Sequence, residues 1–234
     1  MRADSKGFTL LEVVISISLM ALLMVALLVG VRVANRAWQG GEARLRQVHV
    51  EGEREAFLVS QISSLVPYVV TSTDPDIPGK VTILEGTPSC LRFVTRYSSR
   101  FRNRAGLVLA EYAVVPTYPG PLGLALREVP VRNEQALPGH LIERIARDED
   151  SGKMVVQYRP FLLERSDIKL LTGLDRAGFE YLDLHPKDGG EPRWLARWEG
   201  TPEIPYPAAI RLYWEQGGRE TERVIPIRAQ ALPK

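Results

Sequence analysis

An uninterrupted apolar segment near the N-terminus limits the possible folds of this chain more than any other feature. Residues 13–31 carry no charge, and the chain before them begins with the short charged flank MRADSK. At about 1.5 Å rise per residue, a helix over this segment spans roughly 30 Å, the thickness of a bilayer's hydrocarbon core. A cleaved secretory signal usually has a shorter apolar core that ends in small residues, and LVGVR matches that pattern poorly. The segment therefore predicts a transmembrane helix.

The distribution of proline predicts that this helix continues beyond the membrane. All 17 prolines lie at or after Pro67, and a proline-free segment of this length can be one helix because proline removes a backbone donor and clashes with the preceding turn. An apolar stripe at helical spacing runs along residues 32–66. The stripe consists of Leu45, Val48, Val59, Ile62 and Val66. We expect an amphipathic helix that packs on the protein's own sheet and ends before Pro67.

Glu12 is an acid at the start of the apolar segment, where a carboxylate is costly. Placing it in hydrocarbon costs about 2.5 kcal/mol or more unless it is paired or reaches the headgroups. Residues 13–31 contain no basic partner. If the chain were cut after Gly7, the new amine of Phe8 could pair with Glu12 of a neighbouring helix shifted along its axis. The simpler alternative leaves Glu12 at the membrane interface.

The stretch KGFTLLE, from Lys6 to Glu12, together with the apolar run that follows it, resembles the cleavage and methylation signature of type IV pilin precursors. The resemblance implies that residues 1–7 are a leader, recognised at Lys6 and Gly7 and removed by a prepilin peptidase. It further implies cleavage between Gly7 and Phe8, N-methylation of Phe8, and subunit assembly through Glu12. Residues 8–31 would then form the transmembrane and filament-core helix.

The charges around the apolar segment conflict with the orientation that the resemblance implies. A basic cluster follows the segment: Arg32, Arg36, Arg44 and Arg46. The positive-inside rule alone would place the large C-terminal part in the cytoplasm. The resemblance instead implies a cytoplasmic N-terminus in the inner membrane and a periplasmic domain over residues 67–234. We follow the resemblance, because leader processing takes place on the cytoplasmic side.

The sequence after Pro67 changes to short β-like runs separated by proline and glycine. Alternating or apolar runs predict strands over residues 81–84, 91–97, 107–115, 122–129, 154–158, 179–184, 208–215 and 220–227. The last two flank Gln216-Gly-Gly-Arg219 and predict a hairpin, with Pro226 marking an edge strand. The predicted class is α+β, a pilin-like fold in which a long N-terminal helix packs on antiparallel β-sheet.

Three stretches of this C-terminal part resemble the J family of minor pseudopilins of bacterial type II secretion. They are FVTRYSSR before LAEY, LLTGL before GFEYLD, and WLARW before PAAIR. The resemblance implies a non-enzymatic assembly subunit without a cofactor, which helps to form the tip of the pseudopilus. Its implied partners are the minor pseudopilins I, K and H, the major pseudopilin, the prepilin peptidase and the inner-membrane secretion platform. The retained Glu12 argues against the K family, which usually lacks this acid.

Few residues suggest reactive chemistry. The histidines His49, His140 and His185 lack metal-ligand spacing, and no nucleophile or phosphate-loop motif is present. Cys90 is the only cysteine, so we expect a small buried apolar side chain. The acidic stretches at residues 74–76 and 148–150 favour solvated loops over calcium sites, and Trp194 and Trp198 favour packing on the sheet. The formal net charge of +2 gives no indication of nucleic-acid binding.

Two other functions remain open from the sequence. A minor pilin of a type IV pilus or of a DNA-uptake machine would carry the same N-terminus. A periplasmic binding or enzymatic domain, tethered by residues 13–31 alone, belongs to a different class of protein. The tether predicts that Glu12 is dispensable, whereas both assembly functions require it.

Overall fold

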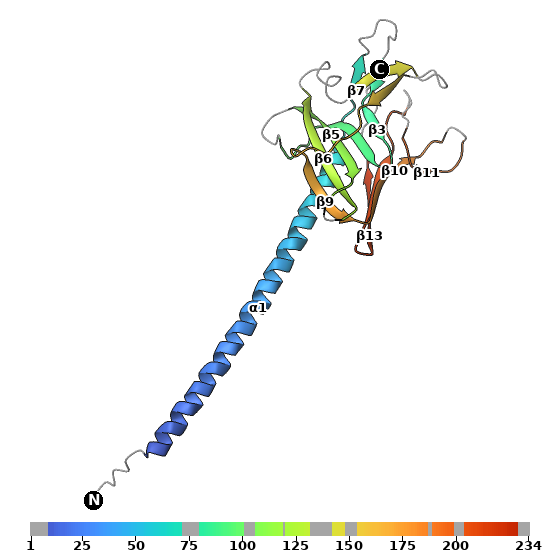
Figure 1. Cartoon of the computed structure of the whole chain (residues 1–234). Helices are drawn as coiled ribbons and strands as arrows, with labels where there is room; N and C mark the ends of the chain where they lie inside the picture. The colour runs from blue at the N-terminus through green and yellow to red at the C-terminus, as the bar shows by residue number, and fades with distance from the viewer. Residues whose placement is uncertain are drawn as a thin grey trace, which may run out of the picture. The chain divides into compact units, whose positions relative to one another are not determined.

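The computed structural model describes residues 9–71, 80–100, 106–118, 120–131, 142–147, 154–186, 189–198 and 204–228. The chain divides into two compact units, Met1–Glu53 and Arg54–Lys234. Helix α1 (Leu10–Ser63) is continuous over 54 residues, beginning in the first unit and ending in the second (Figure 1). The stretch Leu10–Arg36 is long and apolar enough to cross a membrane, and none of it is buried by the rest of the protein.

The largest sheet of the second unit has five antiparallel strands in the order β3-β4-β5-β6-β9. Their bounds are β3 (Leu84–Gly86), β4 (Cys90–Thr95), β5 (Leu107–Val115), β6 (Leu122–Val131) and β9 (Ile168–Leu174). The central strands are covered on both faces. Their sequences are therefore nearly continuous apolar runs and do not alternate between apolar and polar residues.

A second sheet has four antiparallel strands in the order β11-β10-β12-β13. Its strands are β10 (Arg176–Asp183), β11 (Arg193–Leu195), β12 (Ala209–Gln216) and β13 (Arg219–Pro226). Two short hairpin-like pairs complete the described strands: β1 (Val69–Thr71) with β2 (Lys80–Thr82), and β7 (Ile142–Arg147) with β8 (Met154–Tyr158).

The main core lies where the last turns of α1 meet the inner faces of the two larger sheets. Leu58 and Ile62 of the helix are 2% and 0% exposed. They pack with aromatic and aliphatic side chains of both sheets, which include Phe93, Tyr112, Leu126, Phe179, Tyr181, Ile210 and Leu212. A smaller apolar cluster around Val94 and Leu109 fills the opposite face of the five-stranded sheet. The expected α+β, pilin-like fold is confirmed.

A buried amide fixes the end of α1 to the five-stranded sheet. Gln61 is fully buried, and its Nε2 donates to Tyr97 O and to Glu128 Oε1, both at 2.7 Å. The hydroxyl of Tyr112 donates to Gln61 Oε1. Glu128 also accepts hydrogen bonds from the backbone N–H groups of Ser99 and Arg100, at 3.0 and 3.2 Å. The helix, strand β6 and the loop after β4 therefore share one buried polar network.

The helix ends three residues earlier than the position before Pro67 predicts. Leu65 pairs with Thr95 in an isolated bridge, and Val66 N donates to Val94 O at 2.8 Å. The backbone thus changes from helical to sheet bonding before the proline is reached. Val66, predicted in the apolar stripe, lies beyond the helix, whereas Ile62 is buried as expected. The side chains of Leu45 and Val48 lie outside the described residues.

Most of the predicted strands are present with small shifts of their ends. The prediction for residues 107–115 and 154–158 matches β5 and β8, and the last hairpin is shifted by one residue. The run at residues 81–84 is wrong as one strand. It divides at buried Ile83, whose N–H donates to Tyr68 O, so that β2 and β3 belong to different sheets. Strands β1, β7, β9 and β11 were not predicted.

The buried network predicts that Gln61→Leu is destabilising although it makes the core more apolar. The substitution leaves the Glu128 carboxylate and the Tyr112 hydroxyl each short of a partner inside the protein. We expect a loss of about 2–3 kcal/mol in the free energy of unfolding, measured by urea denaturation of the full chain in detergent. Val59→Leu, at a half-buried position of the same helix, is the control. A Gln61→Leu variant as stable as wild type would contradict this role.

Candidate functional site

Thr9 caps the N-terminus of α1 and thereby fixes the position of Glu12 in the first turn. The backbone N–H of Glu12 lies 3.3 Å from Thr9 Oγ1 and 3.0 Å from Thr9 O. Thr9 and Glu12 have the Thr-x-x-Glu spacing of a capping box, in which the threonine oxygen accepts a hydrogen bond from the third helical residue. Thr9 therefore starts the helix through the backbone N–H of Glu12, and the spacing places the Glu12 carboxylate in the first helical turn.

The first turns of the helix also satisfy their polar side chains internally. Ser16 Oγ donates to Glu12 O at 2.7 Å, and Ser18 Oγ donates to Val14 O at 2.8 Å. Such back-bonding removes the cost of placing a free hydroxyl in an apolar surrounding. Apart from Glu12, no ionisable side chain is present until Arg32. Before Arg32, the helix thus presents its environment with an apolar surface and one carboxylate.

Of the sequence-predicted site residues, the structure describes Glu12. Lys6, Gly7 and Phe8 lie outside the described residues, so the predicted cleavage, leader recognition and N-methylation stay predictions. The same is true of His140 and of the acidic stretches at residues 74–76 and 148–150. Within the described part of the chain, no group of three His, Cys, Asp or Glu side chains could hold a metal ion.

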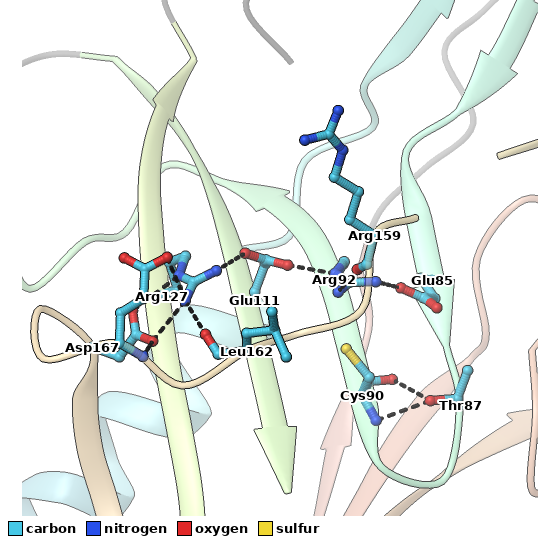
Figure 2. A network of polar contacts seen from close by, with 10 residues as sticks. Glu85, Thr87, Cys90, Arg92, Glu111, Arg127, Arg159, Leu162 and Asp167 are labelled. Atoms are coloured by element: carbon cyan, nitrogen blue, oxygen red, sulfur yellow. Dashed lines mark hydrogen bonds and ion pairs between the residues drawn. The ribbon is translucent and has the colours of Figure 1, made fainter. Parts of the chain in front are cut away.

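A row of alternating charges crosses four strands on the face of the five-stranded sheet that points away from α1. Glu85 of β3 is opposite Arg92 of β4, Arg92 is opposite Glu111 of β5, and Glu111 is opposite Arg127 of β6. Arg92 Nε donates to Glu111 Oε1 at 2.5 Å, and Arg92 also pairs with Glu85 (Figure 2). We call these four residues the charge ladder.

The row continues past Arg127 to the turn before β9. Arg127 forms a bidentate pair with Asp167, with Nε–Oδ1 and Nη2–Oδ2 distances of 2.9 and 2.8 Å. It lies 3.9 Å from Glu111 Oε2, an atom without a hydrogen-bond partner in the described structure. Arg127 therefore binds Asp167 more closely than it binds Glu111, and Glu111 depends mainly on Arg92.

The chain between β8 and β9 covers the charge ladder. Arg92 donates to Arg159 O at 2.7 Å, and Arg127 donates to Leu162 O at 2.6 Å (Figure 2). The rings of Tyr158 and Phe161 lie 5.1 and 4.6 Å from the guanidinium carbons of Arg92 and Arg127, respectively. These contacts add a backbone carbonyl and an aromatic ring to the partners of each arginine, so the ladder holds a connecting segment against the sheet.

Burial dominates the electrostatics of the charge ladder. Glu111 is fully buried and Arg92 is 2% exposed. Loss of hydration raises the pKa of both Glu85 and Glu111 above 4.5, although the neighbouring Arg92 acts to lower it. The pKa of Arg92 is raised in turn by the charges of its partners, which outweigh the effect of its own burial. The arginine stays charged, and the two carboxyl groups carry the cost of burial.

Cys90 lies beside the ladder in a hollow of about 270 Å³ that Thr87, Tyr158 and Phe161 also line. The thiol is half-buried rather than fully buried as predicted. Burial raises its pKa to about 12, so it stays protonated near neutral pH. A protonated thiol is a poor nucleophile and a poor metal ligand. The hydrogen bonds at this position, from Cys90 N to Thr87 Oγ1 at 2.9 Å and between their backbones, close a tight turn.

Trp194 and Trp198 pack on the protein as expected, in different ways. Trp198 is 8% exposed, and its Nε1 donates to Pro205 O at 3.1 Å. Trp194 is half-buried, with the guanidinium carbon of Arg211 4.0 Å from its ring centre. His49 is exposed on α1 and lies 3.2 Å from Glu53. His185 follows β10, far from His49 in the sequence, so neither histidine indicates a site.

Sequence reasoning missed the charge ladder and the amide of Gln61. Three of the predicted strands do contain charges within apolar runs: Leu-Arg-Phe around Arg92, Ala-Glu-Tyr around Glu111, and Arg127 with Glu128 after Leu126. That pattern could have indicated buried charges. Their pairing depends on strand order and register, which the individual patterns do not contain.

Comparison with known protein families places a prokaryotic N-terminal methylation motif at residues 2–28. The match includes Lys6, Gly7, Phe8 and Glu12 and ends inside the apolar helix. Comparisons with curated proteins and with solved structures gave no match. The chain therefore has the N-terminus of a type IV pilin-like precursor, followed by an apolar helix suited to a membrane anchor.

The raised pKa of Glu111 predicts how stability depends on pH. Above pH 4.5 the folded protein holds a proton on this carboxyl more readily than the unfolded chain does, so lowering the pH favours the folded state. Relative to Glu111→Gln, wild type should gain free energy of unfolding as the pH falls from 7 towards 5. Urea denaturation of both proteins across this range measures the difference. A constant difference, or one that grows with pH, would contradict a carboxyl whose pKa is raised by burial.

Proposed function

We propose that this protein is a minor pseudopilin of a type II secretion system, a structural subunit that helps to form the tip of the pseudopilus. The observation that carries the proposal is the methylation motif, which overlaps the 27-residue apolar stretch Leu10–Arg36 of α1 and has Glu12 in the first helical turn. A periplasmic binding or enzymatic domain that is only tethered to the membrane needs a hydrophobic anchor but has no use for this motif. The role we propose is structural rather than catalytic.

In the proposed mechanism, the peptidase removes residues 1–7 on the cytoplasmic side of the inner membrane. Glu12 then becomes the fifth residue of the mature chain, one helical turn from the new terminus. Its carboxylate pairs with the Phe8 amine of a neighbouring subunit and sets the axial step between the two helices. The electrostatic benefit of such a pair is large in hydrocarbon, where an isolated carboxylate is costly.

The choice of the J family among pilin-like proteins rests on three stretches of the globular unit. They correspond to β4 with β5, to β9 with β10, and to β11 with the start of β12. Several of their side chains, among them Phe93, Tyr112 and Phe179, are fully buried in the main core. These residues support a shared framework. The proposed partners, the I, K and H pseudopilins with the major pseudopilin and the secretion platform, follow from that family.

A minor pilin of a type IV pilus or DNA-uptake system is the second candidate, and the methylation motif supports it equally. The two differ in their partners. Co-purification of the full chain with pseudopilins I and K encoded beside it would favour secretion. Co-purification with the subunits of a retractable pilus would favour the second candidate.

The proposed processing predicts the mass of the mature N-terminus. After expression with its prepilin peptidase, the protein should begin at a methylated Phe8. Mass spectrometry of the intact chain and of its N-terminal peptide measures both changes. Gly7→Leu should remain at full length, because a bulky side chain would replace the residue before the cut. A mature chain that begins at any other residue would contradict the proposal.

The assembly role of Glu12 predicts that its charge matters more than its side-chain shape. Glu12→Gln keeps the length and the hydrogen-bonding capacity that a capping box needs, but removes the charge. We expect unchanged membrane insertion and Phe8 processing, with at least about a tenfold loss of cross-linking to neighbouring subunits, since breaking a buried ion pair costs several kcal/mol. Ser18→Ala, on the same helix, should assemble normally. Wild-type assembly of Glu12→Gln would favour the tether.

A further inference from the structure

Strand β13 forms one edge of the four-stranded sheet (Figure 1). It pairs with β12 along its full length, from Gln216 opposite Arg219 to Ala209 opposite Pro226. The two strands are joined by Gly217 and Gly218, whose φ angles of 58° and 75° permit a tight two-residue turn. In the described part of the chain, β12 is the one strand with which β13 pairs.

The register determines which backbone groups of β13 remain open. Ile227 N donates to Ala208 O at 2.9 Å, so the odd-numbered residues of this strand direct their backbone groups towards β12. The N–H and C=O groups of Glu220, Glu222 and Val224 therefore point away from the sheet. Pro226 is also even-numbered, so its backbone nitrogen points away from β12. Its missing N–H costs no hydrogen bond to β12, and the regular pairing continues to the end of the strand.

Natural edge strands are protected by short length, by charged side chains, by proline, by bulges or by covering segments. β13 has charged side chains and a proline but is neither short nor bulged. β13 is eight residues long, and its pairing with β12 contains no irregularity. Val224 is 51% exposed, and the Glu222 side chain is 54% exposed. Proline protects one end of the strand, and glutamate occupies two of the three open positions.

The charges beside this edge are unbalanced in favour of acid. A hollow of about 270 Å³ on the same face is lined by four glutamates and two arginines: Glu180, Glu215, Glu220, Glu222, Arg176 and Arg211. Arg211 already pairs with Glu180 at 2.8 Å and contacts Glu222 at 3.3 Å. Glu220 lies directly opposite Glu215, and like charges in this arrangement repel each other.

We propose that β13 binds a β-strand of another protein that carries Lys or Arg opposite Glu220 and Glu222. The open N–H and C=O groups supply the backbone hydrogen bonds, and the acidic residues select the sequence of the added strand. A second copy of this chain fits less well. Antiparallel pairing of β13 with itself, centred on Glu222, would place the Glu222 side chains of the two copies opposite each other, where like charges repel. The inference does not depend on the proposed function, because a tethered domain would present the same edge.

The test uses the full chain in detergent micelles and two synthetic eight-residue strands. One alternates Lys or Arg with Val and Thr; the other has Glu at every basic position. We expect the basic strand to bind at least about tenfold more tightly by fluorescence anisotropy, and to protect the outward amides of Glu220, Glu222 and Val224 from hydrogen exchange. Equal affinity for the two strands, or protection at a different sheet edge, would overturn the proposal.

Val224→Pro removes one outward N–H and leaves the bonds to β12 in place, as Pro226 already does. It should lower the affinity for the basic strand about fivefold or more, because a net backbone hydrogen bond contributes about 1 kcal/mol. Val224→Thr keeps the N–H and the β-branched shape, and should bind within about twofold of wild type. Equal binding by both variants would exclude strand addition.

Glu220→Lys provides a test that is independent of misfolding, because a misfolded variant would lose affinity for both strands. The substitution replaces the repulsion with Glu215 by an attraction, so the fold is retained. Because Glu222 remains, the variant should lose most of the preference for the basic strand over the acidic one. Glu191→Lys makes the same charge change beside β11, at the opposite edge of the sheet, and should leave the preference for the basic strand unchanged. An unchanged preference in Glu220→Lys would exclude charge selection at this edge.

Discussion

The globular unit depends on the burial of the last turns of α1 between its two larger sheets. A sheet with one apolar face cannot bury that face alone, and here a single helix end serves both sheets. Leu58 and Ile62 supply apolar contact, while Gln61 supplies the polar contacts that fix the helix in rotation and along its axis. Apolar packing alone would tolerate small shifts. The amide, bound to Glu128, Tyr97 and Tyr112, defines one position.

This attachment places different demands on the two ends of the same helix. The N-terminal part of α1 is apolar on all sides and satisfies its serines internally, which suits an environment without water. The C-terminal turns are one-sided, with their buried positions matched to the sheets. Both requirements are compatible with one continuous helix because the intervening residues contain no proline. Glu12 is the exception to the apolar part, and its position coincides with the methylation motif.

Patterns of local sequence predicted much of the fold and only part of the site. The apolar run, the position of the first proline and the Gly-Gly turn are local signals, and each corresponds to an observed element. A local pattern fails to predict the break at Ile83. The apolar run around it is divided between two sheets, because the N–H of Ile83 donates to Tyr68 O and ends the first strand. The charge ladder could not be predicted, since Arg92 and Glu111 meet through strand order and register. The capping role of Thr9 could have been predicted from the Thr-x-x-Glu spacing. The resemblance to pilin precursors instead directed attention to Glu12 and its pairing with a neighbouring subunit.

The charge ladder also limits the ways in which its strands can misalign during folding. Moving β4 by one residue against β5 would send Arg92 into the apolar core and bring Phe93 out of it. Moving it by two residues would keep every side chain on its proper face, and apolar contacts alone would hardly distinguish the result. Arg92 would then face Leu109 or Ala113 instead of Glu111, leaving opposite charges buried without partners. The buried charges thus disfavour two-residue shifts of β4 in either direction, which apolar packing alone would tolerate.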